Sequence, residues 1–445
     1  MNSGILKARR SLLKDIIKKL LLLCKEMAFV IAILAAMIVQ GQDFVNVGLH
    51  GNVDRVQPMT GIVFWADNES DLSSLGNKVQ LEYSYLIYSD VVSQKDVYDW
   101  SVVDNLLMNA AARGRQVLLR FRYTYPGVTT PSVPDYIRNL SDYTDQIKRV
   151  EGSKTYLPDW SHQELQDFTL KFFTKFAERY NTDPRLAFVQ VGFGSYSEYH
   201  LYDGPLALGK TFPSKDYQTT FLKHVDSVFT ELRWAISIDA ADNEFSPIKG
   251  NSSLMNLGFG LFDDSFLHSK HSKNDQEYNR ASWLTFGATR AATQVAGGEF
   301  SYYSNYDQKH MLDVPNGPHG TSFEELADLY DISYIIGNDQ LKYQTAKRIE
   351  EAAINIGYRF KVTSFKSNGA TTKVTIMNIG LAPIYYDAFP SVNGVRSTTS
   401  LKGLLAGQSK TFTINAGATD EQFAIECDRL VGGQIIQFDA DLGSE

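Results

Sequence analysis

Short apolar segments alternate with longer segments of helical periodicity along most of the chain. The apolar segments are rich in Val, Ile, Leu, Phe and Tyr, which is typical of parallel strands buried on both faces. We expect eight such strands, at residues 61–66, 79–87, 116–123, 186–193, 234–240, 257–262, 293–300 and 332–336.

The segments between the expected strands have the spacing of amphipathic helices. One of them has its apolar residues on a single helix face, at Leu165, Phe168, Phe172, Phe173, Phe176 and Tyr180. Eight strands that alternate with helices over residues 45–355 predict an α/β fold, the (β/α)8 TIM barrel. The alternative is an open doubly wound sheet, which normally has a glycine-rich phosphate loop after an early strand. The sequence has no such loop.

The pattern changes near Gly357. Helical periodicity ends, and short apolar segments follow that are separated by Gly, Asn and Ser. This pattern predicts a small C-terminal antiparallel β-sandwich over residues 357–445, which follows in sequence a barrel over residues 43–356. The expected strands of the sandwich are residues 361–364, 372–377, 384–386, 409–414, 422–427 and 434–440.

The N-terminal 42 residues have the order of a secretory signal. Basic residues come first, an apolar run follows at residues 28–39, and Gln40, Gly41 and Gln42 then restore polarity. We therefore expect a secreted, periplasmic or cell-surface protein with no membrane span in its mature part. The alternative is an uncleaved anchor helix that begins near Leu20.

Composition excludes several classes of protein. The net charge of −8 argues against a nucleic-acid binder. Cys24 and Cys427 are the only cysteines, so a disulfide framework and a cysteine zinc site are both excluded. The eight histidines are scattered and match no metalloprotease pattern, and no P-loop occurs. We expect no cofactor and no catalytic metal.

Two glutamates follow glycines where expected strands end. Glu198 comes after Gly192 and Gly194 beyond strand four, and Glu299 comes directly after Gly297 and Gly298 in strand seven. Reactive groups of such barrels lie at the carboxyl ends of the strands. Two carboxyl groups that converge there suit glycoside hydrolysis, in which one protonates the leaving oxygen and the other attacks the anomeric carbon or activates water. The alternative is that both are solvated loop residues.

Other side chains near the expected strand ends are candidates for substrate contact. Arg120 and Arg122 alternate along strand three and so share a face. We expect Arg122, nearer the strand end, to orient Glu299 or to hold an acidic sugar; the alternative is a structural ion pair below the site. Acidic residues there bind sugar hydroxyls or cap the next helix, and aromatic rings stack on sugars or pack in the core. The further candidates are Tyr123, Tyr196, Tyr199, His200, Asp239, Asp263, Asp264 and Tyr302.

The pair of glutamates resembles the site of retaining clan-A glycoside hydrolases, which place an acid on strand four and a nucleophile on strand seven. The resemblance implies that Glu198 is the acid/base and Glu299 the nucleophile. One position departs from it, because Ser197 stands where these hydrolases usually have an Asn that holds the sugar 2-hydroxyl.

The segments 119–123, 194–200, 263–266, 297–299 and 378–385 also resemble a family of secreted bacterial proteins catalogued as domain of unknown function 4832. The first expected barrel strands resemble the module that usually precedes it, catalogued as domain of unknown function 4874. This resemblance covers about residues 44–440 and implies a glycosidase-like barrel with a terminal sandwich.

We therefore expect a retaining glycoside hydrolase that acts on an oligo- or polysaccharide. Two alternatives remain. One is a non-catalytic carbohydrate-binding protein on a hydrolase-like barrel, and the other is a cell-surface scaffold whose aromatic cleft contacts protein.

Overall fold

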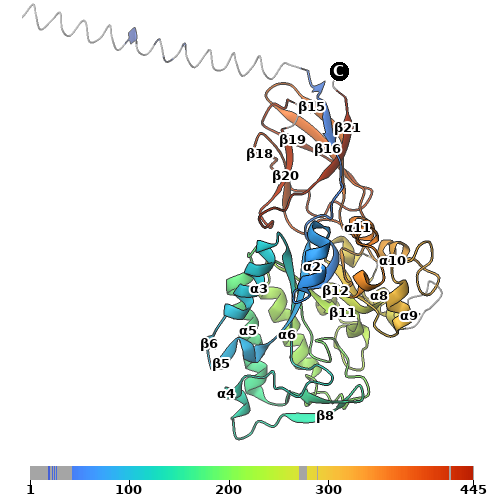
Figure 1. Cartoon of the computed structure of the whole chain (residues 1–445). Coiled ribbons are helices and arrows are strands. Elements are labelled where there is room, and N and C mark those ends of the chain that lie inside the picture. Colours follow the sequence, from blue (N-terminus) through green and yellow to red (C-terminus); the bar gives the residue numbers. More distant parts are fainter. Residues whose placement is uncertain are drawn as a thin grey trace, which may run out of the picture.

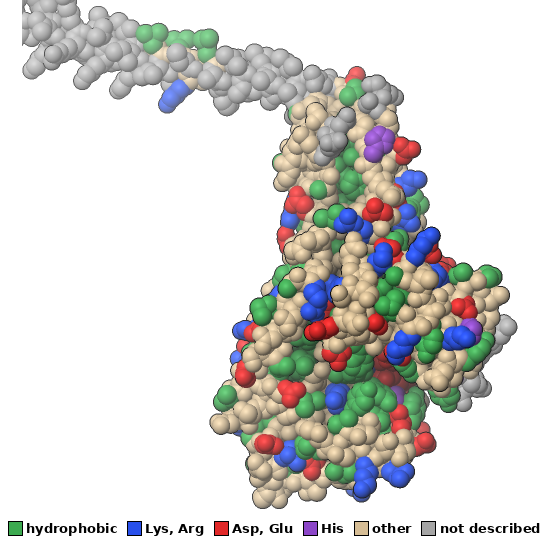
Figure 2. Space-filling model, viewed as in Figure 1, with side chains coloured by type: hydrophobic (Ala, Val, Ile, Leu, Met, Phe, Trp, Pro, Cys, Tyr) green, Lys and Arg blue, Asp and Glu red, His purple; other side chains and the backbone are tan. Residues whose placement is uncertain are grey.

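The computed structural model describes residues 43–269, 278–287, 289–419 and 422–443, together with a few isolated positions before residue 43. The predicted signal therefore lies outside the described residues. Within those ranges, no helix is both long enough and apolar enough to cross a membrane. The described chain forms a barrel with a smaller all-β part at one end (Figure 1). On the face drawn in Figure 2, acidic and basic side chains are interspersed.

Eight parallel strands close the barrel, which confirms the predicted fold and rules out the open sheet. Their order around the barrel is β10-β11-β12-β13-β14-β3-β4-β7. The strands are β3 (Gly61–Trp65), β4 (Leu81–Ile87), β7 (Gln116–Arg122), β10 (Leu186–Gln190), β11 (Arg233–Ser237), β12 (Gly260–Phe266), β13 (Ala296–Phe300) and β14 (Tyr334–Ile336).

Helices cover the outside of the barrel. The longest is α5 (Gln163–Tyr180), whose aromatic face packs on β7 with the Phe172 ring 4.8 Å and the Phe176 ring 5.6 Å from that of Phe121. The other helices are α2 (Glu69–Leu75), α3 (Ser101–Ala112), α4 (Asp135–Arg138), α6 (Lys215–Val228), α7 (Ser252–Met255), α8 (Tyr278–Phe286), α9 (Asn305–His310), α10 (Phe323–Leu329) and α11 (Ala346–Ile354). Two short hairpins lie in the loops: β5 (Val92–Gln94) with β6 (Val97–Tyr98), and β8 (Gln146–Val150) with β9 (Ser153–Leu157).

The C-terminal part contains two sheets. One has the order β19-β16-β15-β21-β2 with β1 also on β15, and the other has the order β18-β17-β20. All pairs are antiparallel except β15 with β21. The strands are β1 (Val45–Asn46), β2 (Leu49–Gly51), β15 (Phe360–Ser367), β16 (Thr372–Asn378), β17 (Ala388–Val392), β18 (Val395–Arg396), β19 (Ser409–Ile414), β20 (Phe423–Cys427) and β21 (Phe438–Leu442). Residues 45–51 thus pair with the C-terminal sheet and not with the barrel to which the sequence assigned them.

The strand predicted at residues 384–386 is wrong. Tyr385 and Tyr386 are buried because they reach the barrel: the Tyr385 hydroxyl donates to the Ala291 carbonyl (2.7 Å), and the Tyr386 hydroxyl accepts from the Arg233 backbone (3.1 Å). Arg233 is the first residue of β11. The C-terminal part therefore contacts the amino ends of barrel strands, away from their carboxyl ends.

Candidate functional site

The loop after β10 folds back on itself and positions Glu198. The Gly194 backbone N–H donates to the Glu198 carbonyl (2.8 Å), and that of Ser195 donates to the His200 carbonyl (2.9 Å). A Cβ on Gly192 would lie 1.8 Å from the Ser197 oxygen, and one on Gly194 would lie 2.1 Å from the His200 oxygen. Only glycine permits so close an approach of two backbones.

Strained backbone directly precedes Glu198. Tyr196 and Ser197 have φ of 57° and 59°, in the left-handed region that residues with a Cβ rarely adopt. Two contacts to β7 hold this conformation: Arg120 donates to the Tyr196 carbonyl (2.8 Å), and the Ser197 hydroxyl donates to the Phe121 carbonyl. Strain of this kind concentrates at functional sites, where the surrounding structure compensates it.

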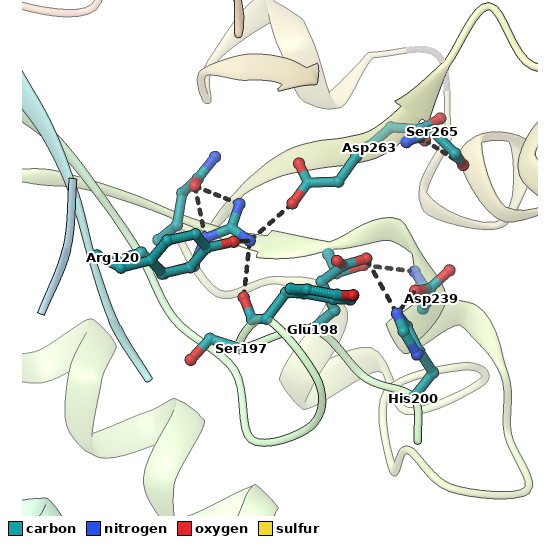
Figure 3. Close-up of polar contacts among 12 residues, drawn as sticks. Arg120, Ser197, Glu198, His200, Asp239, Asp263 and Ser265 are labelled. Atoms are coloured by element: carbon teal, nitrogen blue, oxygen red, sulfur yellow. Dashed lines mark hydrogen bonds and ion pairs between the residues drawn. The ribbon is translucent and has the colours of Figure 1, made fainter. Parts of the chain in front are cut away.

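Glu198, His200 and Asp239 form a buried cluster (Figure 3). The His200 Nε2 lies 3.5 Å from Glu198 Oε2 and 3.8 Å from Asp239 Oδ2. Burial, the Glu198 charge and a hydrogen bond with Glu198 raise the pKa of Asp239 to about 7, and the His200 charge opposes the rise. Burial and the nearby Asp264 charge raise the pKa of Glu198 well above its usual range.

Arg120 is the central cation of the site. Its fully buried guanidinium donates to Asp264 Oδ2 (2.7 Å) and to Gln190 Oε1 (2.8 Å), and it lies 4.1 Å from the centroid of the Phe262 ring. Its positive charge opposes the rise in the pKa of Glu198. The structural ion pair considered for strand three is therefore formed by Arg120 and Asp264.

Glu299 lies on β13 and faces the same cluster of charges. Burial, the Asp264 charge and the Glu198 charge raise the pKa of Glu299 well above its usual range, while Arg120 and a hydrogen bond with the Trp65 side chain lower it. A Cβ on Gly297 would lie 2.3 Å from the Tyr334 ring, so the residue that leads into Glu299 must lack one. The structure thus brings the two glutamates close enough to interact electrostatically.

Tyr302 and Tyr196 also belong to the site. Burial and the Glu299 charge raise the pKa of Tyr302, whose side chain is half exposed. The Tyr196 hydroxyl donates to Glu151 (3.0 Å), and its ring contacts that of Tyr125 at 4.9 Å. Both rings lie where an apolar sugar face could stack.

Three candidates from the sequence are not available to a ligand. Tyr123 is buried, with its hydroxyl 2.7 Å from that of Thr169. Tyr199 is buried against Phe193 and belongs to the core. Asp263 accepts from the Trp283 indole (2.9 Å), as well as from Ser265 and Asn279, and so fixes the loop after β12. The substrate-binding role predicted for these three is wrong, because their side chains are already committed to packing or hydrogen bonds.

Arg122 makes no contact with Glu299. Its guanidinium lies over the Tyr125 ring, 4.7 Å from the centroid. Sequence reasoning missed Tyr85 as a site residue. Tyr85 accepts a hydrogen bond from Arg120 (3.1 Å). Its place near the end of β4 was the available signal. Trp65, which the sequence offers as an aromatic residue near a strand end, is the last residue of β3.

Glu198, His200 and Asp239 are also the one group of described side chains whose ligand atoms, all within 4.8 Å of one another, could hold a metal ion. An imidazole and two carboxylates suit a divalent cation chemically.

The raised pKa of Asp239 predicts a stabilising substitution. As pH rises from about 4 to about 7, the unfolded chain loses the Asp239 proton while the folded protein retains it, so stability falls over this window. D239N removes the cost of ionising this carboxyl in the folded protein. We expect it to raise the free energy of unfolding at pH 8 by on the order of 2 kcal/mol, with little gain at pH 4. Urea unfolding at both pH values measures the difference. The exposed-site variant D135N should change neither value, and equal effects of D239N at both pH values would refute the assignment.

No protein-family model matches the chain. The comparison with curated proteins also finds no match. Among solved structures, the chain is similar to a GH30 endoxylanase from Clostridium papyrosolvens C71, with 13% identity, a TM-score of 0.43, and coverage of 84% of this chain and 99% of that one. It is similar to endo-glycoceramidase II from a Rhodococcus species, with 11% identity, a TM-score of 0.41, and coverage of 83% and 100%. At these TM-scores the likenesses carry no argument, and the barrel is defined by its own strand pairing.

Proposed function

We propose that this protein is a glycoside hydrolase that cleaves an oligo- or polysaccharide with retention of anomeric configuration. Glu198 is the acid/base and Glu299 is the nucleophile. One observation carries the proposal: glutamates that follow the fourth barrel strand and lie on the seventh are both near the buried Arg120, whose charge lowers the pKa of each, and the Glu198 charge raises the pKa of Glu299.

The strand positions of the two glutamates divide the roles, as in the clan-A hydrolases that the pair resembles. Burial is the largest cause of the raised pKa of both glutamates, and the Arg120 charge opposes the rise in both. The proposal places the proton on Glu198 and the negative charge on Glu299, which is the starting state that a retaining mechanism requires.

The reaction then has two steps. Glu299 attacks the anomeric carbon while Glu198 donates its proton to the departing oxygen, and a glycosyl–enzyme ester forms. Glu198, now a carboxylate, accepts a proton from water as that water attacks the same carbon and releases Glu299.

An activated substrate and an added nucleophile test the assignment of Glu198. The leaving group of a dinitrophenyl glycoside needs no acid, so E198Q should still form the glycosyl–enzyme ester. It should hydrolyse that ester about 10²–10⁴-fold more slowly than the wild type does. Azide needs no base, and we expect it to restore turnover and to yield a glycosyl azide with the configuration of the substrate. Product NMR measures this.

The matched control is E178Q, an exposed glutamate of α5, which should behave as the wild type. Absence of an azide effect, or an azide product of inverted configuration, would remove Glu198 from the acid/base role.

One observation favours binding without catalysis as the second candidate. The Ser197 hydroxyl, at the position of the usual sugar-binding Asn, already donates to the Phe121 carbonyl. A protein of this kind would bind saccharides equally well as wild type and as E198Q, and neither form would turn any of them over.

A further inference from the structure

Arg122 differs from the other arginine of its strand. It is the last residue of β7 and is two positions beyond Arg120, so both side chains leave the same face of the strand. Arg120 makes several hydrogen bonds and an ion pair. Arg122 is half buried, and its buried Nε has no hydrogen-bond partner among the described residues.

The surroundings of Arg122 are aromatic, and no described acidic side chain forms an ion pair with it. Its guanidinium lies 4.7 Å from the Tyr125 centroid and 6.0 Å from that of Tyr85. The exposed Asp90 acts on it only through its charge. Burial lowers the pKa of Arg122, yet a guanidinium stays charged in proteins. A half-buried charge without an ion-pair partner carries a desolvation cost, so a ligand anion at this position would be stabilising.

The same tyrosines connect Arg122 to the two glutamates. Tyr85 accepts a hydrogen bond from Arg120 (3.1 Å), and the Glu299 charge raises the pKa of Tyr125. The Tyr85 and Tyr125 rings contact each other at 5.8 Å. The Tyr85 and Tyr125 rings thus lie between Arg122 and the charges of the site.

We propose that Arg122 binds an anionic group of the substrate, so that the saccharide is an acidic one. This inference rests on the proposed function in taking the ligand to be a saccharide. The planar fork of a guanidinium matches a carboxylate through two parallel hydrogen bonds, which favours a uronic acid over a sulfate ester. The excess of carboxyls around Arg120 would repel such a substrate if Arg122 were absent.

Binding measurements in the E299Q background test the inference without dependence on turnover. The probes for calorimetry are oligosaccharides of matched length: an oligogalacturonate, a glucuronic-acid-substituted xylo-oligosaccharide, a sulfated galactan oligosaccharide, and the neutral galactan and xylan oligosaccharides. The added variants are R122M, the charge-conserving R122K, and R55M as an exposed control on the other part of the molecule.

We expect at least one acidic probe to bind about tenfold or more tightly than its neutral counterpart. R122M should remove this preference and weaken acidic binding by about 10- to 100-fold, while neutral binding stays unchanged. R122K should retain most of the preference, and R55M all of it. Equal binding of acidic and neutral probes, or equal weakening of both by R122M, overturns this inference and leaves the proposed function standing. If no saccharide binds, both fall.

Discussion

E299Q is expected to lower kcat by at least about 10³-fold while the protein stays folded. The amide cannot attack the anomeric carbon, so the glycosyl–enzyme ester never forms. Gln has nearly the same shape as Glu and can still accept a hydrogen bond from Trp65. The substitution also removes a buried carboxyl whose pKa is raised by burial. The free energy of unfolding at neutral pH should therefore be unchanged or higher. Release of dinitrophenol from an aryl glycoside and thermal unfolding measure the two effects.

The control for this loss is again E178Q, which changes the same atoms on the exposed surface of α5. If E299Q retained turnover within tenfold of the wild type, Glu299 would not be the nucleophile. If E299Q failed to fold, azide should still restore turnover to E198Q, so the retaining mechanism would remain open to test.

R120M is expected to have the largest effect on stability. It removes the fully buried Arg120 guanidinium, which pairs with Asp264 and whose charge also acts on Glu198 and Glu299, so these three carboxyl groups lose a common counter-charge. Removal of one partner of a buried ion pair costs about 3–5 kcal/mol. The loss should be smaller at pH 5 than at pH 8, because at the lower pH the carboxyls can take up protons and become neutral.

Urea unfolding at the two pH values tests this, with R55M as a surface control that should change stability by less than about 0.5 kcal/mol. Adding D264N to R120M should recover part of the loss at pH 8. A loss below about 1 kcal/mol at pH 8, or one independent of pH, would show that Arg120 does not balance these charges.

The barrel could be predicted from the sequence because each of its strands is a short apolar run between helical segments. The apolar face predicted for the helix that contains Phe172 and Phe176 is the face that packs on the barrel, where both rings contact Phe121. The sequence could not show that residues 45–51 pair with the C-terminal sheet, because the preference of a short strand for one sheet edge depends on tertiary contacts. Tyr385 and Tyr386 belong to a short apolar segment that resembles a strand, but these side chains are buried because they pack against the barrel.

The site was predictable in its two glutamates and less so in their neighbours. Glycines precede both Glu198 and Glu299, and the structure uses Gly192 and Gly298 for close backbone approach. Neighbouring residues point to opposite sides, so Asp264 meets Arg120 whereas Asp263 fixes a loop. Side chains on one face of a strand can still lie at different depths in the barrel. The alternation of residues along the strand does not show this depth.

Depth also separates the two arginines of β7. Arg120 lies within the barrel and forms the ion pair, while Arg122 lies at the strand end and has none among the described residues. The spacing of the two residues placed them on one face correctly but could not say which of them would find an acidic partner.

Trapping of the covalent intermediate tests the two-carboxylate account most directly. The wild type is incubated with a panel of 2-deoxy-2-fluoroglycosyl fluorides, which form the ester readily but release it slowly, and the labelled peptide is identified by mass spectrometry. The account predicts a single glycosyl adduct on the Glu299 carboxylate, absent from E299Q and still formed by E178Q. An adduct on any other residue, or hydrolysis of an aryl glycoside with inversion and no adduct, would contradict it.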